Sequence, residues 1–212
     1  FAFILAIGLF VVLPLFLTTR VFNFDKDALL FNMVAGSLRI IFFLIYLWLI
    51  SMMKDVKRLF QYHGAEHKVV YTFEAGEKLT IENSQKYTTR HPRCGTSFIF
   101  IVLLISILLY SFIDTLIIMG FGSIGLFTRI GYHLLSVPLV AGISYELLKL
   151  SSRYSDNLIT RILIQPGLWL QKITTSPPTD EQIETAIEAL KIAFGDDYEK
   201  YKGKKFEAEA LD

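Results

Sequence analysis

The sequence predicts an all-α protein that crosses a membrane about four times and carries a metal-binding segment and an amphipathic helix outside the bilayer. Of its 212 residues, 53% are hydrophobic, above the roughly 45–50% that is usual for soluble domains even with glycine counted. The apolar residues gather in runs long enough to span a bilayer. Three of the four histidines and the only cysteine fall within residues 63–94.

A membrane-spanning helix needs about 20 mostly apolar residues. Four runs are candidates: residues 1–17, 34–53, 97–119 and 126–148. Helices of a large soluble core are a poor alternative, because uncharged runs of this length rarely occur there. The first run is short and already apolar at Phe1. We therefore expect the chain to begin inside a longer protein, with a secretory signal as the alternative reading of this run.

The distribution of basic residues predicts the orientation of these spans. Residues 54–96 hold eight Lys and Arg, and residues 149–212 hold nine, whereas 18–33 hold two and 120–125 none. Four spans put the two basic segments on the same side, which the positive-inside rule identifies as the cytoplasm. We expect a multi-pass protein of the inner (cytoplasmic) membrane. Its predicted parts are two spans (1–53), a cytoplasmic metal-binding segment (54–96), two spans (97–150) and a cytoplasmic end (151–212).

The cytoplasmic end is predicted to have three parts. Residues 157–175 are apolar and end in the interfacial region, and Pro166-Gly167 is expected to break them. Thr179 and Gln182 form a capping-box pattern at the start of a helix. Ile183, Ile187, Leu190 and Phe194 then make an apolar stripe, and Gly195 can close the helix. The charged residues from 196 to 212 are expected to form a loose tail.

The stretch from 54 to 73 has apolar residues at helical spacing and is expected to continue the second span as a helix. His63 and His67 are four residues apart, so their rings lie on one face. With Glu66 they make the pattern H-x-x-E-H, the inverted zincin spacing, in which the histidines bind zinc and the glutamate is the general base. The competing interpretation is a pair of helical histidines that face water.

A second pair of metal-binding residue types follows in the same loop. His91 and Cys94 are three apart beside Pro92 and Gly95, which favours a tight turn that presents both. A single cysteine forms no internal disulfide, so Cys94 can be a ligand, a nucleophile or a packed side chain. The mixture of imidazole, carboxylate and thiolate favours zinc over magnesium or calcium.

Polar residues in the last two spans give further candidates. Glu146 lies near the cytoplasmic end of the fourth span, where a carboxylate is costly and usually functional. It is therefore a candidate zinc ligand, with pairing to Lys149 as the alternative. Asp114 and His133 lie toward the other end of these spans. They are weak candidates for the paired mid-membrane groups of a transporter.

The motifs together resemble one family. "FQYHGAEHK", "RHPRCGTSF", "PLVAGISYEL" and "PGLWLQKITT" are similar to sequences of the YqhQ family of bacterial membrane proteins, a domain of unknown function whose members are labelled predicted metal-dependent enzymes. The resemblance covers residues 56 to 194. It implies a metal at His63 and His67, with Glu66, His91, Cys94 and Glu146 as companions, and implies no reaction. The glycine-rich opening of these relatives, similar to GGQAVIEGVMMR, is absent here.

The predicted function is that of a membrane-embedded zinc hydrolase. Glu66 is the expected catalytic base, zinc is held by His63 and His67 with His91, Cys94 or Glu146, and Arg90 or Arg93 binds an anionic oxygen. The expected partners are the bilayer, a lipid-linked or membrane-protein substrate and a second copy of the chain, but not nucleic acid. The alternatives are an oligomeric channel or transporter, or a membrane adaptor binding through helix 179–194, in which the metal is structural or regulatory.

Overall fold

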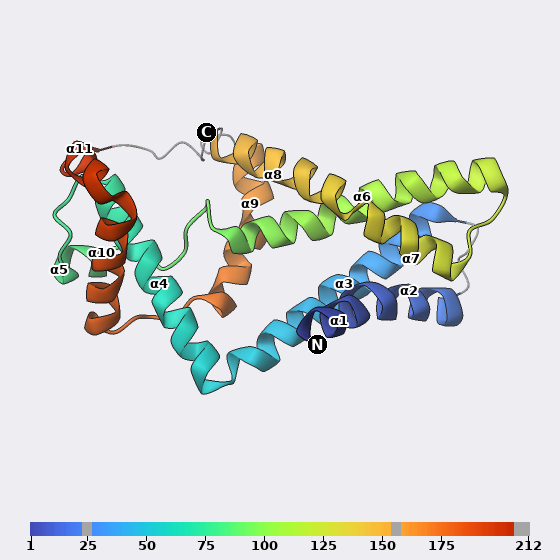
Figure 1. Ribbon diagram of the computed structural model, residues 1–212, viewed down its shortest axis with the longest axis horizontal. Helices are drawn as coiled ribbons and strands as arrows, with labels where there is room; N and C mark the ends of the chain where they lie inside the picture. Colours follow the sequence, from blue (N-terminus) through green and yellow to red (C-terminus); the bar gives the residue numbers. More distant parts are fainter. Residues whose placement is uncertain (23–26, 154–157, 206–212) are drawn as a thin grey trace. The chain divides into compact units, whose positions relative to one another are not determined.

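A computed structural model describes residues 1–22, 27–153 and 158–205 (Figure 1), and the regular structure in these residues is helical. The chain forms two compact units. The first contains residues 1–46 and 98–148, and the second contains residues 47–97 and 149–212.

The first unit is built from long apolar helices. The N-terminal segment consists of α1 (Ala2–Ile7), η1 (Gly8–Val12), α2 (Leu13–Leu17) and η2 (Thr18–Phe22), and Ala2–Val21 is its candidate span. The others are α3 (Ala28–Ser51), α6 (Gly95–Phe121), α7 (Leu126–Leu135) and α8 (Val137–Arg153). Among the described residues, three helices are long and apolar enough to cross a membrane, and α7 with α8, bent by 46°, makes a fourth if the pair is one span. The prediction of a polytopic helical membrane protein is confirmed at this level.

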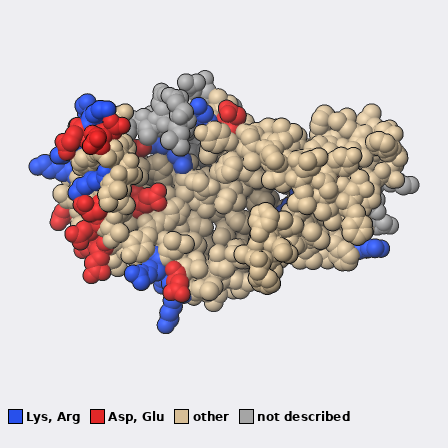
Figure 2. Space-filling model, viewed as in Figure 1, with Lys and Arg blue, Asp and Glu red and all other residues tan. Residues whose placement is uncertain are grey.

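Small residues let the helices of this unit approach closely. A Cβ atom added at Gly36 of α3 would lie 2.2 Å from a side-chain carbon of Ile107 in α6, so only glycine allows this contact. Leu15, Phe31 and Ala35 form a buried core beside Val11, Leu126 and Ile130. The visible face of these helices is almost without charge, whereas acidic and basic side chains gather over α10 and α11 of the second unit (Figure 2).

The second unit is built around α4 (Lys54–Glu74) and α10 (Asp180–Phe194), with α5 (Ile81–Gln85), α9 (Leu158–Thr174), η3 (Gly195–Asp197) and α11 (Tyr198–Tyr201). Ala65 and Val69 of α4 pack against Ile183 and Ile187 of α10 in a buried cluster. The predicted capping box is present, because the Thr179 hydroxyl accepts from the Gln182 backbone N–H and the Gln182 side chain accepts from the Thr179 backbone N–H. The next turns are not a loose tail, since Tyr198 stacks on Phe73.

Two expectations about these helices were wrong. α4 does not continue α3, because the backbone of Met53 is extended (φ −74°, ψ 133°) and a new helix begins at Lys54. Pro166 does not break α9, which runs through it. The adjoining Gly167 packs on Ser97, where an added Cβ would lie 2.5 Å from the hydroxyl oxygen. The helix thus passes through Pro166, which cannot donate a backbone hydrogen bond, beside a close contact with Ser97.

The buried face of α4 includes its small residues. Leu59 is 62% exposed, while Ala65 and Thr72 are fully buried. Gly64 lies in a close contact, since a Cβ there would lie 2.3 Å from the backbone oxygen of Ser176. The chain that follows α9 therefore crosses α4 at its smallest residues, and Leu59 is left outside.

Candidate metal centre

α4 presents His63 and His67 one helical turn apart. Their ring centroids are 4.4 Å from each other, as expected for residues four apart on a helix. His67 is 5% exposed and His63 is half-buried. Lys68, next to His67, holds residues 85–87 against α4 by donating to the backbone oxygens of Gln85 and Tyr87.

The expected turn at residues 91–94 is present, since the Cys94 N–H donates to the His91 carbonyl at 3.3 Å. Cys94 directly precedes α6, and its sulfur accepts from the Thr96 N–H at 3.4 Å. Gln171 of α9 clamps the turn. Its amide oxygen accepts from the His91 N–H at 2.7 Å, and its amide nitrogen donates to the His91 carbonyl at 2.8 Å and to the Ser97 hydroxyl at 3.2 Å.

The helix and the turn bring three metal-binding side chains together. One ligand atom each of His63, His67 and Cys94 lies within 4.8 Å of the other two. His63 Nε2 is 3.1 Å from Cys94 Sγ. This is the one such cluster found in the part of the chain that the structure describes.

The orientation of both rings fits metal binding. His63 Nδ1 donates to the Thr174 backbone oxygen at 2.8 Å, and His67 Nδ1 donates to the Thr89 backbone oxygen at 2.5 Å. A carbonyl oxygen only accepts, so Nδ1 carries a proton in each ring, and Nε2 is the nitrogen that can bind a metal once it has given up the proton that it shares with Cys94. Histidines that bind metals are commonly held by such a bond from the other ring nitrogen.

The same contacts favour the thiolate of Cys94. Burial opposes ionisation and is the largest single effect, but hydrogen bonds from His63, His67 and Thr96 together outweigh it and lower the pKa of Cys94 to about 5. In turn the hydrogen bond to Cys94 raises the pKa of His63, against burial, with smaller help from the Thr174 carbonyl and Glu66. A thiolate is the form of cysteine that binds metals or acts as a nucleophile.

His91 lies next to this cluster, and its ring centroid is 5.6 Å from that of His67. Its Nδ1 accepts from the Arg93 N–H at 3.3 Å, and its Nε2 is 3.7 Å from a carboxylate oxygen of Glu74. Glu74 also pairs with the Arg93 guanidinium. In this arrangement His91 faces Glu74, and Arg93 is engaged by the same carboxylate.

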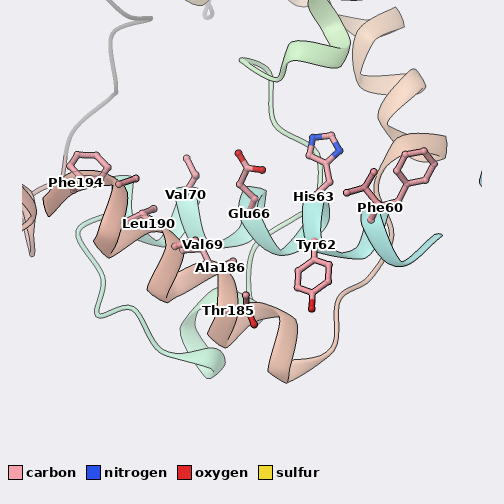
Figure 3. A pocket seen from close by; sticks show the side chains of 13 residues that line it. Phe60, Tyr62, His63, Glu66, Val69, Val70, Thr185, Ala186, Leu190 and Phe194 are labelled. Carbon is pink, nitrogen blue, oxygen red and sulfur yellow. The ribbon is translucent and has the colours of Figure 1, made fainter. Parts of the chain in front are cut away.

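Glu66 is exposed and is not one of the clustered ligands. It lines a cavity of about 700 Å³ between α4 and α10 together with His63. Figure 3 shows the two side chains projecting from the same side of α4. The rest of the lining is mostly apolar, with Leu59, Val70, Leu190 and Phe194 among its residues.

Glu146 and Arg90 are the remaining predicted site residues. Glu146 belongs to α8 of the other unit, where it is exposed. Its part in a metal site stays a prediction. Arg90 is exposed, and its backbone oxygen accepts from the Tyr71 hydroxyl at 3.1 Å.

Comparison with known proteins identifies the family. The model of the family described as "Protein of unknown function (DUF1385)" matches residues 1–196. The chain belongs to this family. "Uncharacterized protein YqhQ" of Bacillus subtilis (strain 168) is 35% identical over 192 residues, which confirms the resemblance seen in the motifs. That match covers 89% of this chain but 57% of the relative. No solved structure matches the chain.

The sequence did not reveal the residues that orient the site. Thr89 and Thr174 act through backbone oxygens, which leave no pattern of residue types. Gln171 lies 80 residues from the turn that it clamps. Its one available signal was an amide side chain in the apolar stretch 157–175, where a buried polar group needs partners.

Proposed function

We propose that this membrane protein holds one zinc ion at His63, His67 and Cys94 and hydrolyses a substrate that has an apolar part. The observation that carries the proposal is the orientation of the two imidazoles. Each has its Nδ1 proton committed to a backbone carbonyl, and the Nε2 side of each ring meets the Cys94 sulfur, so a zinc ion would take the place of the protons shared there.

The donor set fits zinc. Two imidazole nitrogens and a thiolate are ligands that zinc accepts, and three protein ligands leave one of its four usual positions open. Zinc with an open position supplies Lewis acidity, which makes water nucleophilic near neutral pH. His91, in its contact with Glu74, is outside the proposed ligand set and supports the turn instead.

Glu66 is the proposed proton acceptor. It adjoins His67 in sequence, is exposed and faces the same cavity as His63, so its carboxylate is accessible without being a ligand. The apolar lining of the cavity suits an acyl chain or an apolar peptide segment. Because the charge pattern predicts the cytoplasmic side for this segment, lipid-linked and membrane-protein substrates are the classes proposed.

The test compares metal content with function. Purified protein should contain about one zinc per chain, and the double variant His63→Ala/His67→Ala should contain almost none. Glu66→Gln should keep its zinc and its fold but fail to complement a strain lacking the gene, because removal of a general base costs about 10²–10⁴-fold in rate.

Glu184→Gln is the matched control, an exposed glutamate of α10 that does not line the cavity. It should behave as the unchanged protein does. Full zinc in the double histidine variant would contradict the metal site. A Glu66→Gln protein with both zinc and full function would contradict the catalytic role and leave zinc structural.

A further inference from the structure

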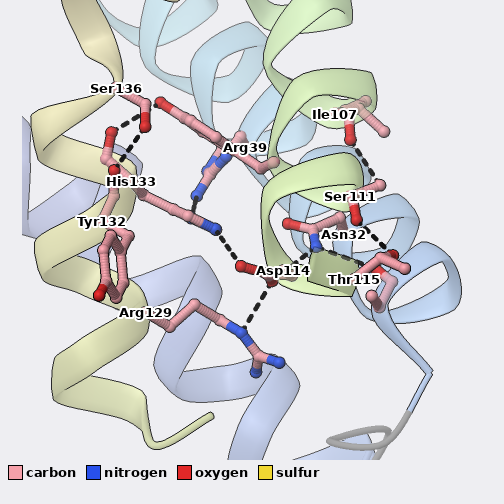
Figure 4. A network of polar contacts seen from close by, with 12 residues as sticks. Asn32, Arg39, Ile107, Ser111, Asp114, Thr115, Arg129, Tyr132, His133 and Ser136 are labelled. Atoms are coloured by element: carbon pink, nitrogen blue, oxygen red, sulfur yellow. Dashed lines mark hydrogen bonds and ion pairs between the residues drawn. The ribbon is translucent and has the colours of Figure 1, made fainter. Parts of the chain in front are cut away.

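The second unit contains an open cavity of the size of a ligand site. In the first unit, by contrast, buried polar side chains contact one another, as Asp114 does with Arg129 at 2.9 Å and with His133 at 3.1 Å (Figure 4). The cavity between α4 and α10 has a volume of about 700 Å³ and mostly apolar walls. Ligand pockets commonly have volumes of about 300–1,000 Å³ and walls of this kind, so the cavity is suited to binding another molecule.

The cavity is a groove that follows both helices, the α4–α10 groove. The two helices run in the same direction, since Gln61 contacts Gln182 and, farther along both, Phe73 contacts Phe194. The lining residues of α4 lie between positions 59 and 70, which is about 17 Å of helix. One chain of a lipid crosses one leaflet, or half of a hydrocarbon core of about 30 Å. The groove therefore has the length of a lipid chain.

Small residues of α10 leave room for such a chain. Ala186, Ala189 and Ala193 line the groove at spacings of three and four, so they lie on one face of the helix. Figure 3 shows Phe60 and Phe194 at opposite ends of the row of lining side chains. A peptide would need partners for its backbone polar groups, and mostly apolar walls offer few. An unbranched hydrocarbon chain needs none.

One end of the groove follows a membrane span closely in the chain. α3 has 24 residues, about 36 Å of helix, which is more than a hydrocarbon core of about 30 Å. A span made of α3 therefore ends near Ser51, at the edge of the bilayer, and the exposed Met52 and Met53 come next. Leu59, the first lining residue, follows Ser51 by eight residues, within about 20 Å. The groove is thus within reach of a lipid in the bilayer.

Basic side chains gather at this end of the groove. Lys54, Lys57 and Arg58 are exposed, with Asp55 as the acid among them. The Arg58 guanidinium lies over the ring of Tyr62 at 5.9 Å, and Tyr62 lines the groove. Basic residues beside the end of a span attract anionic lipids. The charge at this end therefore suits a lipid phosphate.

The acid in the groove gives the direction of the lipid. Among the described residues that line the groove, Glu66 is the one acid, and it follows Arg58 by eight residues, about 12 Å along α4. An anionic head group is attracted to Arg58 and repelled by Glu66, so the head belongs at the membrane end and the chain extends toward Phe194. His63 lines the groove between these two charges, beside the links that join head and chain.

We propose that the α4–α10 groove binds one chain of an anionic glycerophospholipid, with the phosphate at Lys57 and Arg58. This names the substrate class for the hydrolysis proposed above, and it rests on that proposal for the fate of the lipid. Water would add to an ester carbonyl beside His63 and the acyl–oxygen bond would break, giving a carboxylic acid and an alcohol. Binding alone requires neither zinc nor hydrolysis.

The test uses the full chain in vesicles of phosphatidylglycerol and phosphatidylcholine. A trace of phosphatidylglycerol carries a photoreactive diazirine at the end of one chain, which is joined by an ether bond that hydrolysis does not cleave. After illumination, mass spectrometry of peptides locates the adducts. Adducts in the candidate spans α3 and α6 are the internal standard. Adducts should also form in α10, because a chain end in the groove lies beside residues 186–194.

Variants assign the α10 adducts to the groove. Ala189→Trp fills the groove and should remove most of them, whereas Ile192→Trp, at an exposed position outside the lining, should keep them. Arg58→Gln should lower them about tenfold, because a charge-assisted contact with phosphate is lost. Lys78→Gln, which removes another exposed charge of the same unit, should not. A phosphatidylcholine probe with the same chain should give fewer α10 adducts than phosphatidylglycerol.

Each other outcome contradicts the proposal. Adducts confined to the spans would overturn it, as would α10 adducts that persist in Ala189→Trp or are equal for the two lipids. A change of oligomeric state in Ala189→Trp, without α10 adducts in the unchanged protein, would assign the groove to a second copy of the chain. Failure of zinc binding or of hydrolysis would leave the α10 adducts in place, so the two proposals fail separately.

Discussion

Cys94 and His63 change each other's protonation, and this coupling makes the site sensitive to pH. The lowered pKa of Cys94 contributes stability that is lost as pH falls toward about 5. The raised pKa of His63 contributes stability that is lost as pH rises above the ordinary imidazole value. Between about pH 5 and roughly 6.5 the Cys94 effect acts alone, so the stability of zinc-free protein should rise across that interval, and above it the two effects oppose each other.

The first prediction concerns the thiolate itself. Its ultraviolet absorbance in zinc-free protein should titrate with a pKa of about 5, and in His63→Ala the pKa should move toward the ordinary thiol range because a hydrogen-bond donor is gone. Cys94 is the only cysteine, so Cys94→Ser provides the blank. A thiol of ordinary pKa in the unchanged protein would contradict the hydrogen-bonded arrangement.

At the scale of elements, α9 organises the site although it supplies no clustered ligand. Gln171 is fully buried and holds the turn at His91, and the last turn of α9 presents the Thr174 carbonyl to His63. Partners that hold a metal site in this way commonly contribute to affinity. The helix is thus a support for residues that lie far from it in the sequence.

Gln171→Leu tests this support. The change keeps a side chain of similar size but removes all three hydrogen bonds, so zinc affinity should fall by about tenfold or more, and the unfolding midpoint should fall as well. Gln165→Leu is the control, because Gln165 is an exposed residue of the same helix. Equal zinc affinity in the two variants, measured by competition with a chelator dye, would contradict the supporting role.

Helices with a strong local pattern were predictable from the sequence. The stretch predicted as 54–73 is α4 at Lys54–Glu74, and the capping box of Thr179 and Gln182 begins α10. The break at Met53 was missed because no Gly or Pro marks it. The helix through Pro166 was missed because proline usually breaks a helix, and the contact of Gly167 with Ser97, 70 residues away, has no local sequence signal.

The sequence was enough to predict which residues form the candidate site, but not how all of their side chains are oriented. Helical spacing placed His63 beside His67, and the short turn brought Cys94 to them. The direction of His91 depends on Glu74, 17 residues earlier, which no spacing rule connects to it. In the first unit, the pairing of Arg129 with Asp114 arises from packing between α6 and α7.

For the molecule as a whole, the charge distribution makes a prediction about topology. The basic segments 54–96 and 149–212 should both face the cytoplasm. In a Cys94→Ser background, cysteines replacing the exposed residues Glu82 and Lys205 should be protected from a membrane-impermeant thiol reagent in intact cells. A cysteine replacing Ser123, in the uncharged connection between α6 and α7, should be labelled. Labelling at position 82 or 205 in intact cells would contradict this orientation.

The main-chain contacts of the two site histidines have a consequence for engineering the centre. Every residue type carries the same peptide oxygen, so replacing Thr89 or Thr174 leaves the acceptor in place. The position of each of these two oxygens depends on the number of residues between it and the next helix of the chain. The length of the segments around residues 86–94 and 171–178 is therefore the quantity to preserve in a redesign, while Thr89 and Thr174, whose backbone oxygens hold the rings, can be replaced. Insertions and deletions, more than substitutions, should disable such a centre.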